Sequence, residues 1–97
     1  MEREYGRLAF DRIDLSCPPE EGRQLCREVA AAPPKRIGGF KVTGVDRLDG
    51  TKLLFGEKGW VLFRQSGTEP VLRLYCEAPT AATVAAILRQ ARALIRR

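Results

Sequence analysis

The sequence predicts an α+β domain, with a mostly antiparallel sheet of four or five strands and two helices packed on one of its faces. Two observations predict this class. Segments of strand-like and helix-like periodicity follow one another in the order strand, helix, several strands, helix. The central strands are separated by short turns rich in glycine, aspartate and proline, which is typical of antiparallel hairpins. The other face of such a sheet is open to a ligand or to partner domains.

The first strand and the first helix are expected before residue 35. Apolar residues alternate with charged ones over residues 7–15, but the alternation shifts between Phe10 and Ile13, which allows a bulge there. Pro18-Pro19 ends this strand and suits the first turn of a helix. Pro33-Pro34 ends the helix.

The middle of the chain predicts a run of consecutive strands. Asp49-Gly50 is a two-residue hairpin signal, and a polar loop from Gln65 to Pro70 separates the last two strands. The expected strands are Phe40 to Leu48, Thr51 to Phe55, Trp60 to Phe63, and Val71 to Glu77.

A second helix is expected after Pro79, with Thr80 as its N-cap. Its apolar residues recur at the spacing of one helix face and would pack on the sheet. They are Val84, Ile87, Leu88, Ala91, Leu94 and Ile95.

Length and composition predict one domain, residues 1–97, of a soluble globular kind. No apolar run is long enough to cross a bilayer, and Met1 to Glu4 does not resemble a secretory signal, so a cytoplasmic location is expected. The three cysteines lack the number and spacing of a disulfide framework or a zinc site, and there is no histidine. The net charge of +5 favours anionic partners without choosing among them.

The loop after the third of these strands carries side chains that suit a phosphate dianion. Arg64 and Arg73 offer planar forks that match two phosphate oxygens, and Ser66 and Thr68 offer hydroxyl donors. Gly67 allows the backbone to come close and present its N–H groups. The same residues also fit an ordinary hairpin connection, because Ser-Gly-Thr is common in turns. Composition alone leaves both interpretations open.

A longer pattern resembles one family. Residues 64–77 read R-Q-S-G-T-E-P-V-L-R-L-Y-C-E, and this is similar to the phosphate loop R-P-S-G-T-E-P followed by x-x-R-x-Y-x-E in the C-terminal domain of α-D-phosphohexomutases, the phosphoglucomutase/phosphomannomutase family. The preceding D-G-x-K-L-x-F and G-W-V-L patterns, at Asp49 and Gly59, also resemble that family. Gln65 departs from it, because the family usually has proline there.

The resemblance implies a function and an assignment of residues. Residues 1–97 would be the fourth domain of a mutase, an isomerase and intramolecular phosphotransferase of carbohydrate metabolism. The domain would bind the non-transferred phosphate of a hexose phosphate. Glu69 would orient the arginines or cap the loop, and Pro70 would support it. The phosphate ligands would be Arg64, Ser66, Gly67, Thr68 and Arg73.

The family's phosphoserine and its magnesium-binding aspartate loop belong to other domains. Ser16 and Ser66 are the two serines of this chain, and its aspartates do not cluster. The chain is therefore expected to hold no catalytic residue, no metal and no cofactor of its own, and to be inactive as an isolated domain. Its expected partners are the hexose phosphate and the other domains of the same mutase. The sequence does not choose among glucose, mannose and glucosamine.

Two alternatives use the same open sheet face. One is a small basic nucleic-acid-binding module with Trp60 or Tyr75 as stacking platforms, although the aromatic residues are few and most are expected in the core. The other is a regulatory domain whose phosphate loop has lost its ligand. Membrane partners are not expected, and nucleic acid is disfavoured.

Overall fold

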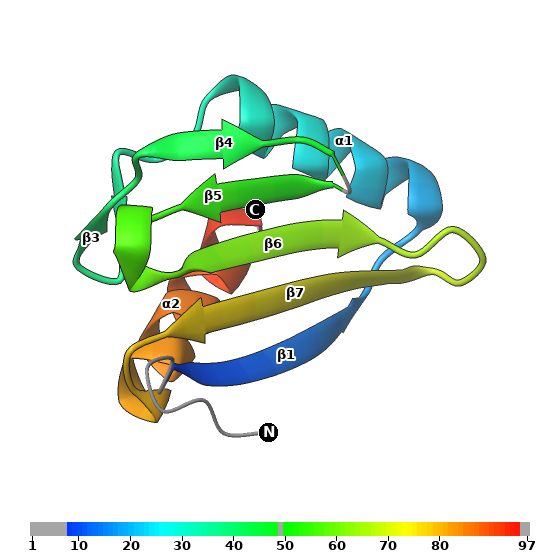
Figure 1. Ribbon diagram of the computed structural model, residues 1–97. Coiled ribbons are helices and arrows are strands. Elements are labelled where there is room, and N and C mark those ends of the chain that lie inside the picture. The colour runs from blue at the N-terminus through cyan, green and yellow to red at the C-terminus, as the bar shows by residue number, and fades with distance from the viewer. Residues whose placement is uncertain (1–7, 49, 96–97) are drawn as a thin grey trace.

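The chain folds into one antiparallel sheet covered on one face by two helices, as expected (Figure 1). The computed structural model describes residues 8–48 and 50–95. The elements in chain order are β1 (Ala9–Ser16), α1 (Pro19–Ala31), β2 (Arg36–Ile37), β3 (Phe40–Lys41), β4 (Gly44–Asp46), β5 (Thr51–Leu54), a 3-10 turn η1 (Gly56–Lys58), β6 (Trp60–Gln65), β7 (Val71–Ala78) and α2 (Ala81–Ile95).

The main sheet has five strands in the order β1-β7-β6-β5-β4, and every pair is antiparallel. Strands β4 to β7 are sequential neighbours, because hairpin turns join them. Strand β1 instead pairs with β7, so the beginning of the described chain lies beside its last strand. The β1–β7 register runs unbroken from Ala9 opposite Ala78 to Ser16 opposite Val71. The bulge allowed for between Phe10 and Ile13 is therefore absent. The two charged residues between them, Asp11 and Arg12, are paired in a regular ladder.

The stretch predicted as one strand from Phe40 to Leu48 is divided, so this prediction was wrong in detail. Arg36–Ile37 and Phe40–Lys41 form a separate small hairpin, and only Gly44–Asp46 joins the main sheet. The turn of the small hairpin is made by Gly38 and Gly39, whose φ angles of 60° and 86° are left-handed conformations that glycine adopts readily. The β4–β5 connection spans residues 47–50 rather than two residues. Strands β6 and β7 run slightly beyond the predicted ends.

Both helices begin where the sequence predicts. Pro18 precedes α1, with a proline in the first turn that has no N–H to leave unpaired. The N–H of Thr83 donates to the hydroxyl of Thr80 at 3.0 Å, so Thr80 is the N-cap of α2. Helix α1 packs mainly over β6, with β5 and β7 on either side, and α2 packs over β7 and β1.

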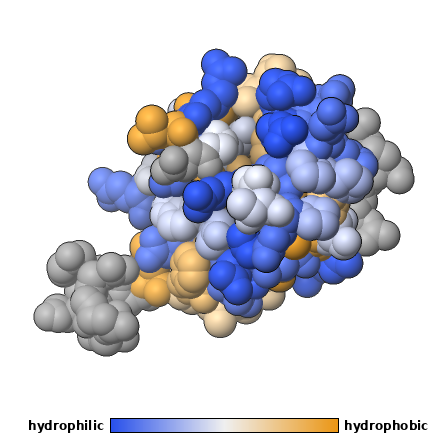
Figure 2. All heavy atoms as spheres, turned by 90° about the vertical axis from the view of Figure 1, so that its right-hand side faces the viewer, coloured by the Kyte–Doolittle hydropathy of each residue, from blue (hydrophilic) through white to orange (hydrophobic). Residues whose placement is uncertain are grey.

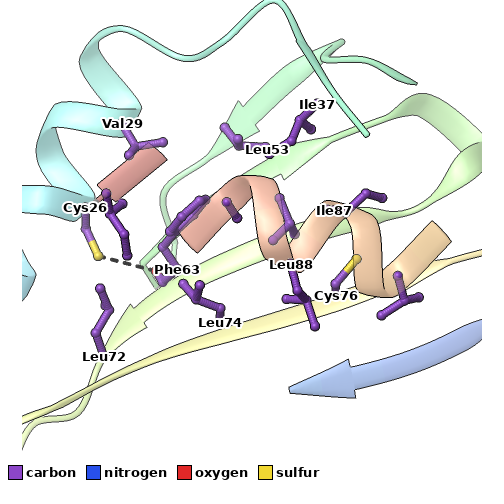
Figure 3. Packing of buried hydrophobic residues seen from close by; sticks show 14 of the residues in the cluster. Cys26, Val29, Ile37, Leu53, Phe63, Leu72, Leu74, Cys76, Ile87 and Leu88 are labelled. Atoms are coloured by element: carbon purple, nitrogen blue, oxygen red, sulfur yellow. Dashed lines mark hydrogen bonds between the residues drawn. The ribbon is translucent and has the colours of Figure 1, made fainter. Parts of the chain in front are cut away.

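The core lies between the helices and the sheet, and Figure 3 shows its side chains converging there. Strand β7 alternates residue by residue between half-buried and buried positions, as expected when one face is covered. Phe63 and Leu74 are fully buried, and Thr51 is the buried polar residue among those described. The Thr51 hydroxyl donates to the carbonyl of Cys26 at 2.7 Å, which satisfies it and joins β5 to α1.

The three cysteines are free and buried. Burial raises the pKa of the thiols of Cys17 and Cys26, and raises the pKa of Cys76 to about 12. All three are therefore protonated near neutral pH and are poor nucleophiles. Neither described helix is long and apolar enough to span a membrane.

Candidate functional site

The predicted phosphate loop is the connection between β6 and β7. Residues 66–70 form a turn that projects beyond the end of the sheet, on the right-hand side of Figure 1. The N–H of Ser66 donates to the carbonyl of Val71 at 2.9 Å and so continues the β6–β7 ladder to the base of the loop. The N–H of Cys17 donates to the carbonyl of Pro70 at 2.9 Å. The loop is thus fixed both to its own hairpin and to the segment between β1 and α1.

Ser66 organises the loop from within. Its hydroxyl oxygen accepts the N–H groups of Thr68 and Glu69, at 3.3 and 3.2 Å. This is a local side-chain turn of the kind that serine forms in place of backbone hydrogen bonds. The hydroxyl hydrogen of Ser66 is not used in these contacts, so it can be donated outward.

Gln65 braces the loop from the helix side. Its Nε2 donates to the carbonyls of Ser66 and Glu69, both at 3.2 Å. The other end of the same amide lies against Gly22 of α1, where a Cβ atom would collide with Oε1. Gln65 thus fills the space between α1 and the loop and holds two loop carbonyls. Gln65 restrains the loop through side-chain hydrogen bonds, whereas a proline at this position would restrain the backbone φ angle.

We expect Gly22→Ala to loosen the loop while leaving the fold intact. Alanine gains about 0.5–1 kcal/mol in a helix interior relative to glycine. Its Cβ would however displace the Gln65 amide, which is the end of a flexible side chain, and break the two contacts with the loop carbonyls. Amide hydrogen exchange should therefore accelerate at residues 66–69, with the thermal midpoint nearly unchanged.

Arg23→Ala is the control for this test, because it raises the helix propensity of α1 and Arg23 makes no hydrogen bond with Gln65. Its exchange rates at residues 66–69 should equal those of the parent chain. Unchanged loop exchange in Gly22→Ala would show that the Gln65 brace does not hold the loop.

Arg64 and Arg73 lie directly opposite each other on neighbouring strands. They are paired in the β6–β7 register, and paired residues of an antiparallel ladder lie on the same face. Their neighbours Phe63 and Leu74 are fully buried under the helices, so both arginines belong to the face that the helices leave open. The two guanidinium groups therefore start from one side of the sheet, at the base of the loop.

Two carboxylates hold Arg73 in place. Its Nη2 lies 3.4 Å from Oε1 of Glu69, and its Nε lies 3.7 Å from Oδ1 of Asp14. Asp14 is opposite Arg73 on β1 and also contacts Arg12 at 3.4 Å. Glu69 thus contacts an arginine of the site. The Nε of Arg73 is buried and has no hydrogen-bond partner in the described structure, because the contact with Asp14 is too long for a hydrogen bond.

Several donors of the loop are unused in the described part of the chain. The N–H of Gly67, the hydroxyl of Thr68 and the guanidinium of Arg64 make no hydrogen bond or ion pair with any described residue. A Cβ added at Gly67 would meet nothing within 4 Å, and its φ is not positive. The fold therefore does not require a glycine there, and the space beside it is open.

Arg64 and Gln65 also line a cavity on the other side of the loop's base. The cavity has a volume of about 460 Å³ and lies between α1, the β4–β5 turn and the end of β6. Sequence reasoning did not anticipate it, because its lining comes from three segments that are far apart in the chain. Asp14 and Gly22 were missed for the same reason, since neither carries a local signal of contact with the loop.

The open sheet face carries an aromatic group that was expected mostly in the core. Trp60 and Tyr75 are half-buried there, and the exposed ring of Phe10 lies 6.3 Å from the first and 6.4 Å from the second, between ring centroids. Trp60 donates its Nε1–H to Glu77 at 3.0 Å, and the Lys52 ammonium lies 4.8 Å from the Trp60 ring centroid. The strand parity of Trp60 directs it away from the helices, onto the open face where the nucleic-acid alternative would use it.

No group of three or more metal-ligating side chains occurs within residues 8–48 and 50–95. The polar groups left unused among the described residues of the loop and at Arg64 are hydrogen-bond donors, whereas Arg73 already contacts the carboxylates of Asp14 and Glu69. Donors attract anions and repel cations. The donors left unused at this end of the sheet are of a kind that can pair with the oxygens of an anion.

Comparison with known proteins gives consistent relatives. Over 96 residues, 99% of this chain, it is 28% identical to a probable phosphoglucosamine mutase of Pyrococcus furiosus and covers 20% of that protein. Over 56 residues, 58% of the chain, it is 52% identical to the phosphoglucomutase/phosphomannomutase of Thermococcus kodakarensis and covers 11% of it. Over 75 residues, 75% of the chain, it is 41% identical to the phosphomannomutase of Mycoplasma genitalium and covers 14% of it.

The chain thus spans between 11% and 20% of the length of these curated relatives. The family described as "Phosphoglucomutase/phosphomannomutase, C-terminal domain" matches residues 27–94, which include the loop, both arginines and all of α2 but its last residue. With that match over more than half of its length, the chain belongs to the phosphohexomutase family as a phosphoglucomutase/phosphomannomutase C-terminal domain.

Proposed function

We propose that this domain binds the non-transferred phosphate of a hexose phosphate, as the fourth domain of a phosphoglucomutase/phosphomannomutase-type enzyme. The observation that carries the proposal is the pairing of Arg64 with Arg73 on one sheet face, at the base of a loop with unused donors. Two like charges placed opposite each other across a ladder destabilise it by about 0.2–1 kcal/mol. A dianion beside them would turn that repulsion into attraction.

Gly67 supports the same proposal. A glycine that serves neither a left-handed turn nor a close contact inside the fold gives no benefit to folding, and it costs backbone entropy. Its use is understandable if another molecule approaches the backbone there. The free N–H of Gly67, the hydroxyls of Ser66 and Thr68, and the two guanidiniums would then surround the phosphate oxygens.

The role of such a site is positioning. Holding the phosphate that does not react fixes the sugar, so that its other end lies at groups supplied by the rest of the enzyme. Contacts with the exposed carboxylates of Asp14 and Glu69 favour one orientation of Arg73 before the ligand arrives, which reduces the entropy lost on binding. The magnesium and the phosphoryl-carrying serine expected from the family would belong to other domains, and this chain alone would turn over no substrate.

The affinity of the isolated domain is expected to be low. Each charge-assisted hydrogen bond contributes on the order of 1.5–3 kcal/mol, and association costs at least several kcal/mol of lost freedom. We therefore expect a dissociation constant in the millimolar range, which corresponds to a binding free energy of roughly −4 kcal/mol.

A titration with glucose 1-phosphate tests the proposal. The backbone amides of residues 64–73 should shift in a ¹H–¹⁵N spectrum, and the shifts should saturate in the millimolar range. Arg73→Ala should weaken binding by about tenfold or more, because one charge-assisted contact is lost. Arg73→Lys should weaken it less, since it keeps the charge and loses the fork.

Gly67→Ala separates binding from folding. Since a Cβ at this position meets open space and the backbone needs no positive φ, the variant should be as stable as the parent chain while its phosphate affinity falls. Absence of loop shifts with glucose 1-phosphate would refute the proposal. Broad shifts over Trp60 and Tyr75 with a short oligonucleotide, and none with the sugar phosphate, would favour a nucleic-acid-binding module instead.

A further inference from the structure

The cavity beside the loop is lined by four arginines and by no described carboxylate. Its residues are Arg23, Cys26, Arg27, Ala30, Arg47, Gly50, Thr51, Arg64 and Gln65. They come from three parts of the chain: α1, the β4–β5 turn and the end of β6. Asp49 adjoins this turn in the sequence and lies outside the described residues. Figure 2, which views the loop end of the molecule, shows hydrophilic residues over most of this side.

Helix α1 separates its charges into two stripes. Arg23 and Arg27 stand one turn apart and line this cavity, whereas Glu20, Glu21 and Glu28 line a different hollow on the helix surface. Positive side chains at i and i+4 repel each other, where an acidic residue at either position would have stabilised the helix. None of the four cavity arginines forms an ion pair with a residue of the described structure. The positive stripe therefore has no neutralising partner within the part of the domain seen here.

The walls of the cavity are fixed by hydrogen bonds. The Thr51 hydroxyl donates to the carbonyl of Cys26 at 2.7 Å, and the Cys26 thiol donates to the carbonyl of Phe63 at 3.5 Å. Figure 3 shows the second of these contacts, between α1 and β6. Helix and sheet are thus joined at two residues beside the cavity, Thr51 and Cys26, which also line it. The volume of about 460 Å³ is that of a small-molecule site.

We propose that this cavity is a second anion site, which binds a small organic phosphate carrying two adjacent phosphate groups, through Arg23, Arg27 and Arg47. Guanidinium forks match phosphate oxygens in pairs, and several of them around one cavity favour a ligand with more than two negative charges. This site lies on the helix side of Arg64, and the hexose phosphate site lies on the open face. It does not depend on the loop, because Ser66, Thr68 and Arg73 are absent from its lining. Occupancy would tie α1 and the β4–β5 turn to the strand that carries the loop.

Pyrophosphate is the probe for the experiment, titrated into the 97-residue chain at constant ionic strength. Amide shifts should appear at Cys26, Arg27, Gly50 and Thr51. Arg27→Ala should weaken binding by about tenfold, as expected for the loss of one charge-assisted contact. Arg27→Lys should weaken it less. Arg89→Ala, which removes an exposed arginine of α2 outside the cavity, is the matched control and should leave the affinity unchanged.

Two further measurements distinguish binding in the cavity from binding at the loop. Arg73→Ala should weaken glucose 1-phosphate binding at the loop by about tenfold or more and leave pyrophosphate binding in the cavity intact. Arg27→Ala should weaken pyrophosphate binding by about tenfold and leave the loop shifts with glucose 1-phosphate intact. The inference is overturned if Arg27→Ala and Arg89→Ala weaken pyrophosphate equally, or if sulfate produces the same shifts at the same concentration. It is also overturned if a short oligonucleotide binds the cavity more tightly than pyrophosphate, because the partner would then be a nucleic acid.

Discussion

Gly59→Ala is expected to unfold the domain or to destabilise it by about 3 kcal/mol or more, at or above the upper end of the strain of an unfavourable φ alone, which is of order 1–3 kcal/mol. Gly59 has a φ of 131°, which residues with a side chain rarely adopt. Its Cβ would also collide with the carbonyl oxygen of Glu77 and lie 2.9 Å from the carbonyl carbon. These are backbone atoms of β7, so no side chain can move aside. The free energy of unfolding, measured by urea denaturation, should fall accordingly.

Gly39→Ala is the matched control for Gly59→Ala. Gly39 has a φ of 86°, which is also left-handed, but a Cβ there would meet nothing within 4 Å. Gly39→Ala should lower the free energy of unfolding by about 1 kcal/mol, from backbone strain alone. Equal losses in the two variants would contradict the steric argument, and would mean that β6 and β7 can separate at Gly59 at little cost.

The sheet and helices were predictable because their signals are local. The alternation in β7, the proline at the start of α1 and the Thr80 cap each depend on neighbouring residues, and each is present in the structure. The division of the stretch from Phe40 to Leu48 was not predictable in this way. Gly38-Gly39 closes a separate hairpin there, with the N–H of Gly38 donating to Gln90 of α2 at 2.7 Å. That contact joins residues far apart in the sequence.

The candidate site also combines residues that are close in the sequence with residues that only the fold brings together. The loop residues and Arg73 lie within ten positions of one another, so a single segment of sequence was enough to group them. Asp14 reaches Arg73 only because β1 pairs with β7, and Gly22 reaches Gln65 only because α1 crosses behind β6. The four-arginine cavity is assembled in the same way, from α1 and two hairpins. Sequence reasoning grouped the residues that are proposed to contact a phosphate, and the fold adds the residues that contact them.

Phe63→Ala is expected to cost about 3–5 kcal/mol of unfolding free energy, because it leaves a large cavity at the centre of the core. The side chain of Phe63 is fully buried between the sheet and the helices, and its backbone carbonyl accepts a hydrogen bond from the Cys26 thiol. Leu62, one residue earlier, is half-buried on the open face, and Leu62→Ala should cost about 1 kcal/mol. Urea denaturation of the two variants measures the difference. Because side chains alternate along a strand, the residue after Phe63 must face the same side as Leu62. A larger loss in Leu62→Ala than in Phe63→Ala would place Arg64 under the helices, away from Arg73 and from any phosphate that the two could share.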